Sequence, residues 1–143
     1  MHFVTGGAFN GKRKWVKQHV LKDNETYSWI SGYEKKCAYD WIKIESFQTI
    51  TVIEGVEQFL YDHLEREDWK SHWLQVMHIW EKWEREDSSR SLILIGTDMT
   101  KGIVPLEAKE RLWRDVSGWC FQDIVKRAER VDIIWYGINE RIK

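Results

Sequence analysis

A glycine-rich stretch near the N-terminus has the residue types and the spacing of a phosphate-binding loop. Gly6, Gly11 and Lys12 match the pattern G-x-x-x-x-G-K. In such a loop the backbone N–H groups surround phosphate oxygens, and the lysine neutralises part of their charge. Lys12 is also a candidate catalytic residue, because an ammonium can stabilise charge on a transferred phosphoryl group. The candidate residues for binding a nucleoside triphosphate, GTP or ATP, are Gly6, Gly7, Ala8, Asn10, Gly11, Lys12 and Arg13.

The residue after the lysine departs from the usual pattern. A hydroxyl residue that ligates Mg²⁺ is expected there, and this chain has Arg13. The guanidinium could donate a pair of hydrogen bonds to phosphate, or it could simply be a solvated residue of the first helical turn. A guanidinium cannot ligate a cation and would repel one. Mg²⁺ as a cofactor is therefore in question at this position.

Two acidic residues stand at the ends of expected strands, where they could hold Mg²⁺. Glu54 follows the apolar run that ends at Ile53, and Asp98 follows the run that ends at Ile95. In phosphate-loop enzymes a strand-end carboxylate holds the metal directly or through water. Glu54 is thus a candidate catalytic and metal-binding residue, and Asp98 is a candidate for metal and nucleotide binding. The alternative is that both acids only cap helices or form turns.

Strands and helices that alternate along the chain are expected to position these residues. Apolar runs rich in β-branched residues predict strands, and apolar residues three or four apart predict helices. We expect strands at 3–5, 26–30, 47–53, 91–95 and 131–136, and helices at 12–21, 56–64, 69–83 and 112–128. Pro105 is expected in the first turn of the last helix, and Tyr33 to Ser46 is expected to form a loop or a short irregular helix.

This alternation predicts an α/β fold, namely a three-layer P-loop NTPase-like fold with a mainly parallel central sheet and helices on both faces. In such folds the ligand binds at the carboxyl edge of the strands. The length of 143 residues fits a single nucleotide-binding domain, 1–143.

The chain has ten tryptophans, several of them on one stripe between Trp69 and Trp83. Aromatic residues at helical spacing usually pack in a core, but they could also stack on a flat ligand or a partner helix. Ten tryptophans exceed what one small core usually takes. A homo-oligomer interface is therefore the expected place for the excess.

Composition excludes several other classes of protein. With 22 basic and 23 acidic residues, no long-range field favours nucleic acid or an acidic membrane. Cys37 and Cys120 show no disulfide pattern, and no histidine pair recurs with cysteines at a zinc spacing. No apolar run approaches the ~20 residues that a membrane helix needs. We expect a cytoplasmic protein with no nucleic-acid partner and no membrane partner.

Beside the glycine loop and Glu54-Gly55, three further segments are informative. They are Gly102-Ile103-Val104-Pro105 after Thr97-Asp98, Arg114-Asp115 with Gly118 and Gln122, and the closing stretch from Asp132 through Gly137-Ile138 to Ile142-Lys143. Together these segments resemble the bifunctional adenosylcobinamide kinase and adenosylcobinamide-phosphate guanylyltransferase family of cobalamin biosynthesis. The loop and Glu54-Gly55 are similar to the family's loop and to its acidic residue after a buried strand. The ordered occurrence of these segments is more specific than any one of them.

The resemblance implies a nucleotide and a corrinoid as ligands. This sequence nevertheless departs from the family's pattern at two positions that carry its chemistry. The family's loop ends in Lys-Ser, and its guanylyl-carrying histidine lies between the second and third strands. Here Arg13 replaces the serine, and no histidine stands between His19 and His63. The region between the second and third strands, Tyr33 to Ser46, is also shorter here than in the family. These differences predict that at most the kinase activity is retained. The alternatives are a catalytically silent homologue that serves as a nucleotide- or partner-binding subunit, and a kinase for another small alcohol.

Overall fold

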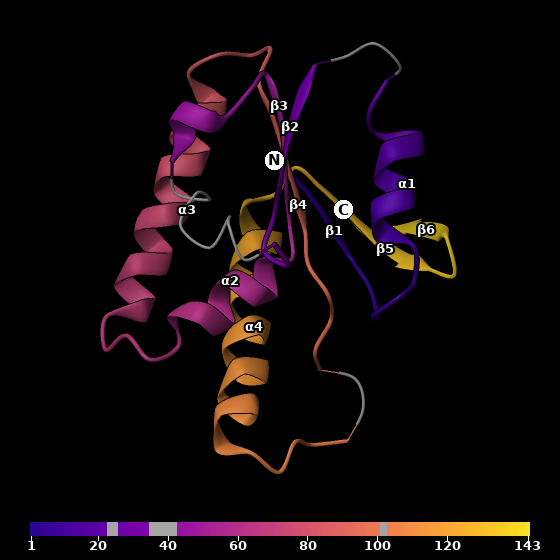
Figure 1. Ribbon diagram of the computed structural model, residues 1–143. Coiled ribbons are helices and arrows are strands. Elements are labelled where there is room, and N and C mark those ends of the chain that lie inside the picture. Colours follow the sequence, from indigo (N-terminus) through magenta and orange to yellow (C-terminus); the bar gives the residue numbers. More distant parts are fainter. Residues whose placement is uncertain (23–25, 35–42, 101–102) are drawn as a thin grey trace.

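A computed structural model describes residues 1–22, 26–34, 43–100 and 103–143 of the chain. A central sheet runs through it, with helices on either side (Figure 1). The strands are β1 (His2–Thr5), β2 (Tyr27–Ser31), β3 (Ile50–Glu54), β4 (Ser91–Ile95), β5 (Arg130–Trp135) and β6 (Ile138–Arg141). The helices are α1 (Lys12–His19), the 3₁₀ helix η2 (Ile44–Ser46), α2 (Val56–His63), α3 (Trp69–Arg85) and α4 (Ala108–Arg127).

The strand order explains how the candidate residues come together. The sheet has the order β2-β3-β4-β1-β5-β6, and every pair except β5 with β6 is parallel. Register places Ile95 opposite both Val4 and Glu54. The carboxyl ends of β1, β4 and β3 therefore lie side by side, with β4 in the middle. Since neighbouring strands are ~4.8 Å apart, the β1 loop and Glu54 are about 10 Å apart across the sheet.

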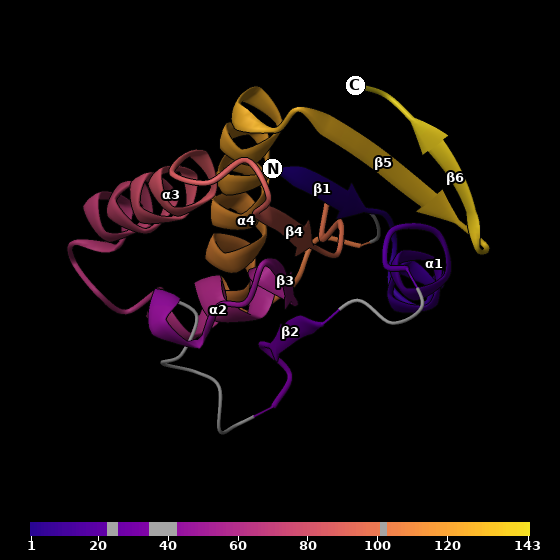
Figure 2. The ribbon, with the colours of Figure 1, turned by 90° about the horizontal axis from the view of Figure 1, so that it is seen from above.

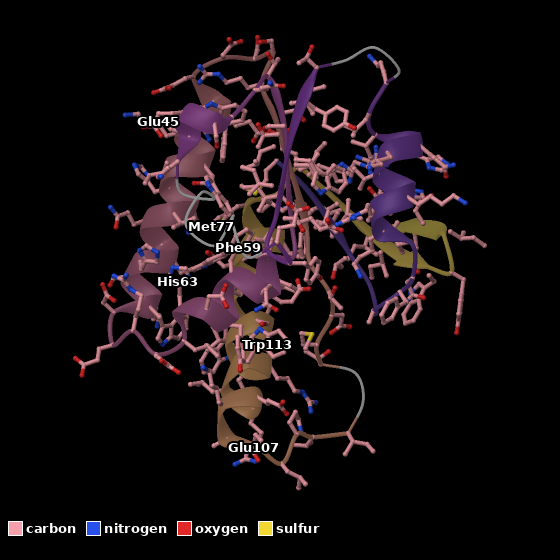
Figure 3. The ribbon with its side chains drawn as sticks, viewed as in Figure 1. Glu45, Phe59, His63, Met77, Glu107 and Trp113 are labelled. Atoms are coloured by element: carbon pink, nitrogen blue, oxygen red, sulfur yellow. The ribbon has the colours of Figure 1, made fainter. Side chains whose placement is uncertain are left out.

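Helices cover both faces of the sheet, as the three-layer prediction requires. Figure 2 shows α1 on one face and α2, α3 and α4 on the other. Beneath α1, the buried Trp15 and Val16 pack on Val4 and Ile93 of the sheet. Phe59 and Met77 belong to the larger core on the opposite face (Figure 3). Both are fully buried, and burying such a side chain contributes about 1.5–3 kcal/mol to folding.

The strand predicted at 47–53 begins later than expected, at Ile50. Thr51 Oγ1 donates to the carbonyl oxygen of Gln48 at 2.8 Å and accepts from the Gln48 N–H at 3.1 Å. These bonds bend the chain at Gln48 and Thr49, directly before the ladder begins at Ile50. Phe47 packs edge-on against Trp83 of α3, with 5.1 Å between the ring centroids, instead of joining the sheet.

The prediction for Pro105, in the first turn of the last long helix, was wrong. Pro105 lies before the helix, because the N-cap is the extended Glu107 and α4 begins at Ala108. The apolar residues of this helix are not all buried. Val116 and Cys120 are buried, but Leu112 and Trp119 are 43% and 58% exposed.

Strand β6 was not predicted as a separate element. Tyr136 and Gly137 have φ values of 49° and 83°, which form a two-residue turn between β5 and the antiparallel β6. Positive φ at both central residues is the pattern of the hairpin turns that suit twisted strands. Gly137 could have indicated the turn. The residues of β6 are exposed and show no apolar alternation, so the sequence gives no sign of the strand itself.

The tryptophan stripe on α3 packs mainly in the core. Trp73, Trp80 and Trp83 are buried, and Trp119 of α4 stacks on Trp69 at 6.4 Å with an interplanar angle of 11°. Of the two cysteines, Cys120 is buried and Cys37 lies outside the described residues. The predicted loop at 33–46 is described only in part, and η2 falls at its end.

No helix within the described ranges combines the length and the apolar character needed to cross a bilayer.

Candidate nucleotide site

The glycine loop joins β1 to α1 at the carboxyl edge of the sheet. Gly6 and Gly11 have φ values of 137° and 87°, which L side chains rarely adopt. A Cβ at Gly6 would lie 2.3 Å from the carbonyl oxygen of Ile134, so a side chain has no room there. The two fixed glycines of the pattern are thus required by backbone shape. Gly11 is the N-cap, and α1 starts at Lys12, so the free N–H groups of the helix start at the loop.

Neighbouring segments hold the loop in place. The Asp98 N–H donates to the Gly6 carbonyl oxygen at 3.0 Å. From the β5–β6 turn, the Gly137 N–H donates to the Asn10 carbonyl oxygen at 2.9 Å, and the Tyr136 N–H donates to Asn10 Oδ1 at 3.2 Å. Asn10, predicted to bind nucleotide, therefore anchors the loop to the hairpin through its side chain.

The tip of the loop faces solvent. Ala8 and Phe9 are both exposed, and Phe9 has a φ of 59°. Gly7 sits inside the turn, where a Cβ would lie 2.6 Å from Asn10 Nδ2. The loop thus has a fixed base and an open side.

Lys12 folds back over the loop that precedes it. Its Nζ donates to the carbonyl oxygens of Gly6 at 3.1 Å and Gly7 at 2.8 Å, and the residue is only 8% exposed. Burial lowers the pKa of this ammonium, while the nearby carboxylates of Glu57, Glu54 and Asp98 oppose that shift. The loop therefore contains a buried cation whose only hydrogen bonds within the described part of the chain go to neutral carbonyls.

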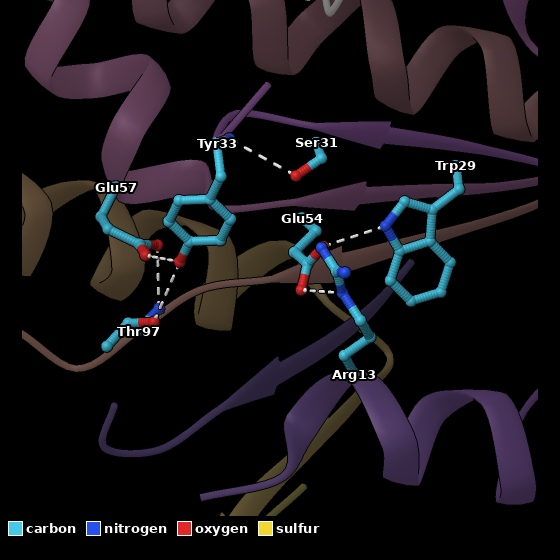
Figure 4. A network of polar contacts seen from close by, with 7 residues as sticks. All are labelled: Arg13, Trp29, Ser31, Tyr33, Glu54, Glu57 and Thr97. Carbon is cyan, nitrogen blue, oxygen red and sulfur yellow. Dashed lines mark hydrogen bonds and ion pairs between the residues drawn. The ribbon is translucent and has the colours of Figure 1, made fainter. Parts of the chain in front are cut away.

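Arg13 forms an ion pair with Glu54 across the end of β4 (Figure 4). Its Nε lies 2.9 Å from both carboxylate oxygens, and one terminal nitrogen also donates to Oε2. Trp29 Nε1 donates to the same Oε2 at 3.0 Å, and the guanidinium carbon lies 5.8 Å from the centre of the Trp29 ring. The hydrogen bond to Glu54 raises the pKa of Arg13, so the guanidinium stays charged.

These contacts do not fit Mg²⁺ at Glu54. Magnesium requires oxygen ligands at ~2.1 Å in near-octahedral geometry. Both oxygens of Glu54 already accept protein N–H groups, and the guanidinium that they hold would repel a cation. At the other predicted ligand, Asp98 Oδ1 accepts the backbone N–H of Thr100 at 2.9 Å and its hydroxyl at 2.5 Å. Among the described residues, no three His, Cys, Asp or Glu side chains cluster around a possible metal position.

A second polar cluster beside the loop was not predicted. Glu57, in the first turn of α2, is 2% exposed and accepts the Thr97 N–H at 2.9 Å. The Tyr33 hydroxyl donates to Glu57 and lies 3.3 Å from Thr97 Oγ1 (Figure 4). Burial, reinforced by the Glu57 carboxylate, raises the pKa of Tyr33, so this phenol stays protonated. The available signal was the spacing of Glu57, three residues after Glu54, which places it at the same sheet edge.

Two further contacts lie near the loop. Arg114 of α4 donates to the Thr100 carbonyl oxygen at 2.9 Å, which ties the segment after Asp98 to the helix. His19 of α1 is exposed and stacks on Trp15 with 5.3 Å between the ring centroids.

Together, the mainly parallel sheet, the two helical layers and the loop at the carboxyl edge define a P-loop NTPase-like fold. A scan against protein families matches residues 28–142 to cobinamide kinase / cobinamide phosphate guanyltransferase. This is most of the chain, so the protein belongs to that family, whose members act in cobalamin metabolism and bind nucleoside triphosphates. A search of curated proteins found no match. The family match begins after the glycine loop.

Proposed function

We propose that this chain binds a nucleoside triphosphate, GTP or ATP, at the loop Gly6–Lys12 and acts in cobinamide metabolism, retaining at most the kinase activity of its family. The observation that carries the proposal is the buried ammonium of Lys12, which has only the carbonyls of Gly6 and Gly7 as partners among the described residues. Phosphate oxygens would replace these neutral acceptors with charged ones. In addition to the hydrogen bond, an ammonium next to a phosphate oxygen gains the attraction between opposite charges, which is stronger at a buried site than in water.

The other groups at this edge support the same ligand. Backbone N–H groups at the start of α1 attract anions, and no acidic residue stands in the first turn to compete with phosphate. Lys12 would then stabilise charge on the transferred group. Glu54 would act as a positioning residue through its hold on Arg13. No step is assigned to Mg²⁺, because the residues present do not fit it.

Titration with GTP and ATP, followed by tryptophan fluorescence, tests nucleotide binding. Trp15 lies on α1 and Trp29 lies beside Arg13, so a ligand in the loop is expected to change their emission. We expect saturable binding of at least one nucleotide in the micromolar to low millimolar range, where a weak, specific site lies. If neither nucleotide binds at millimolar concentration, the proposal fails.

A second candidate function is that of a catalytically silent homologue, a nucleotide-binding or partner-binding regulatory subunit. The Arg13–Glu54 ion pair favours it, because the carboxylate that would place a metal is already engaged. Phosphoryl transfer from bound nucleotide to cobinamide separates the two candidates. Binding without transfer to cobinamide or to another small alcohol would favour the silent homologue.

The guanylyltransferase activity of the family is proposed to be lost. A covalent guanylyl intermediate needs a nucleophilic histidine, and none stands between His19 and His63. Incubation with GTP labelled at the α-phosphate is expected to leave no acid-labile label on the protein, as read by gel and mass spectrometry. A stoichiometric phosphoramidate on any of the five histidines would contradict this prediction.

Homo-oligomer formation remains a proposal. Leu74 of α3 and Trp119 of α4 are 46% and 58% exposed, so part of the apolar surface is left uncovered on the helical face. Light scattering coupled to size-exclusion chromatography measures the molar mass directly. A mass of 17.3 kDa at micromolar concentration would show a monomer and reject the proposal.

A further inference from the structure

The position of Arg13 has a consequence for the form of nucleotide that the loop accepts. In phosphate-loop enzymes the metal lies between the strand-end acid, the residue after the lysine and the phosphates. Here the strand-end acid is Glu54, and the residue after Lys12 is Arg13, which binds that acid directly. The guanidinium therefore stands where those two residues would otherwise share a cation.

We propose that the guanidinium of Arg13, fixed on Glu54, takes the place of Mg²⁺, and that the loop binds a metal-free nucleoside di- or triphosphate. This inference rests on the proposed function and deepens it. The site supplies its own cation, and the nucleotide does not bring one.

The guanidinium keeps a free side for phosphate. Its bonds to Glu54 use Nε and one terminal nitrogen, and the other terminal nitrogen carries two further N–H donors. The side chain of Arg13 is 52% exposed, whereas that of its partner Glu54 is 8% exposed. One edge is therefore held from inside the protein while the opposite edge reaches solvent beside the loop.

Trp29 restricts Arg13 further. The indole lies against the guanidinium and donates to the same carboxylate, so ring, acid and guanidinium form one unit (Figure 4). The ammonium of Lys17 lies 5.2 Å from the centre of the same ring, from the next turn of α1. A guanidinium held in this way loses little freedom when it binds phosphate, which favours affinity.

The charges at the site predict how Mg²⁺ affects binding. A free triphosphate brings only negative charge to Lys12 and Arg13. A Mg²⁺-nucleotide complex brings two positive charges against the Arg13 guanidinium, and repulsion between like charges at short range lowers affinity. The inferred site therefore prefers nucleotide in EDTA over nucleotide in excess Mg²⁺.

Isothermal titration of the imido analogues of GTP and ATP, in EDTA and in excess Mg²⁺, tests the inference. For the wild-type chain we expect affinity in EDTA to equal or exceed that in Mg²⁺. Arg13→Ser removes the guanidinium and restores a hydroxyl, so its affinity in EDTA is expected to fall about tenfold and to recover with Mg²⁺. Lys17→Ser is the matched control. It removes a cation over the same ring, on the next turn of α1, and should keep the wild-type response to Mg²⁺.

Thermal melting of each variant confirms that it is folded, and Arg13→Lys serves as a second variant. Lysine keeps the charge but lacks the planar fork that holds Glu54 with one edge and presents the other edge to phosphate, so we expect weaker binding that still gains nothing from Mg²⁺. Wild-type binding that is tighter in Mg²⁺ than in EDTA would overturn the inference and leave the proposed function standing. An Arg13→Ser variant that stays indifferent to Mg²⁺ would also overturn it. Absence of wild-type binding in both buffers would overturn both.

Discussion

Replacing Lys12 with alanine is expected to weaken the binding of GTP and ATP by about 10- to 100-fold. Hydrogen bonds to charged groups contribute ~1.5–3 kcal/mol, and this ammonium is positioned to donate them to phosphate. Lys12 is buried within the loop and has only the Gly6 and Gly7 carbonyls as hydrogen-bond partners in the described structure. Dissociation constants from fluorescence titration measure the change.

Lys14→Ala is the matched control for Lys12→Ala. It removes the same charge from the same helical turn, but its side chain is exposed and lies outside the loop. We expect less than about a threefold change, since an exposed charge contributes little in water. Equal losses in both variants would indicate a non-specific electrostatic effect. An unchanged affinity in Lys12→Ala would show that the loop is not the site.

Replacing Asp132 with alanine is expected to lower the free energy of unfolding by about 3 kcal/mol. Asp132 is fully buried in β5 and binds three neighbours. Its carboxylate accepts from Arg130 Nε at 2.6 Å and from Asn139 Nδ2 at 2.9 Å, and lies 2.7 Å from His2 Nε2. Removing it deprives the buried His2 of β1, Arg130 of β5 and Asn139 of β6 of their shared carboxylate. The melting temperature is expected to fall by roughly 10 °C.

The pH dependence of this loss follows from the pKa of Asp132. Burial alone would raise that pKa, but the hydrogen bonds from Arg130, Asn139 and His2 together lower it below 3.8. The stabilisation is therefore fully present above pH 3.8 and is lost as the pH falls through the pKa of the folded state. Denaturant titrations at several pH values measure it.

Glu140→Ala, on the exposed face of β6, is the control for Asp132→Ala. We expect a change within about 0.5 kcal/mol at neutral pH. If Asp132→Ala were as mild as this control, the network would not contribute to stability. A loss for Asp132→Ala that persisted undiminished below the folded-state pKa would mean that packing, and not the carboxylate charge, carries the effect.

The sequence predicts the layers of this fold better than its edges. The apolar runs at β1 and β4 have no helical spacing and are buried on both faces, so the strands could be located. The start of β3 could not, because the bend at Gln48 depends on contacts with the hydroxyls of Thr51 and Ser28, which no sequence pattern indicates. Strand β6 pairs only with β5 and is exposed, so no hydrophobic pattern marks it.

The candidate site shows the same division. Glycine spacing indicated the loop, but the reason that Gly6 must be glycine lies in Ile134, on a strand 128 residues later in the sequence. Arg13 was visible as a departure, yet its partner Glu54 is 41 residues away and is brought near only by the strand order. From the sequence alone, Trp29 is an ordinary residue of an expected strand. Its contact with the ion pair depends on which face of β2 it occupies.

The most direct test of the central claim is a crystal structure of the wild-type chain with the imido analogue of GTP. The account predicts phosphates within the Gly6–Lys12 loop, with Lys12 Nζ moved from the Gly6 and Gly7 carbonyls to phosphate oxygens. Arg13 should still contact Glu54 and should donate to phosphate with its outer edge. Phosphates bound away from the loop would contradict the account, as would Mg²⁺ coordinated by Glu54 with Arg13 turned away.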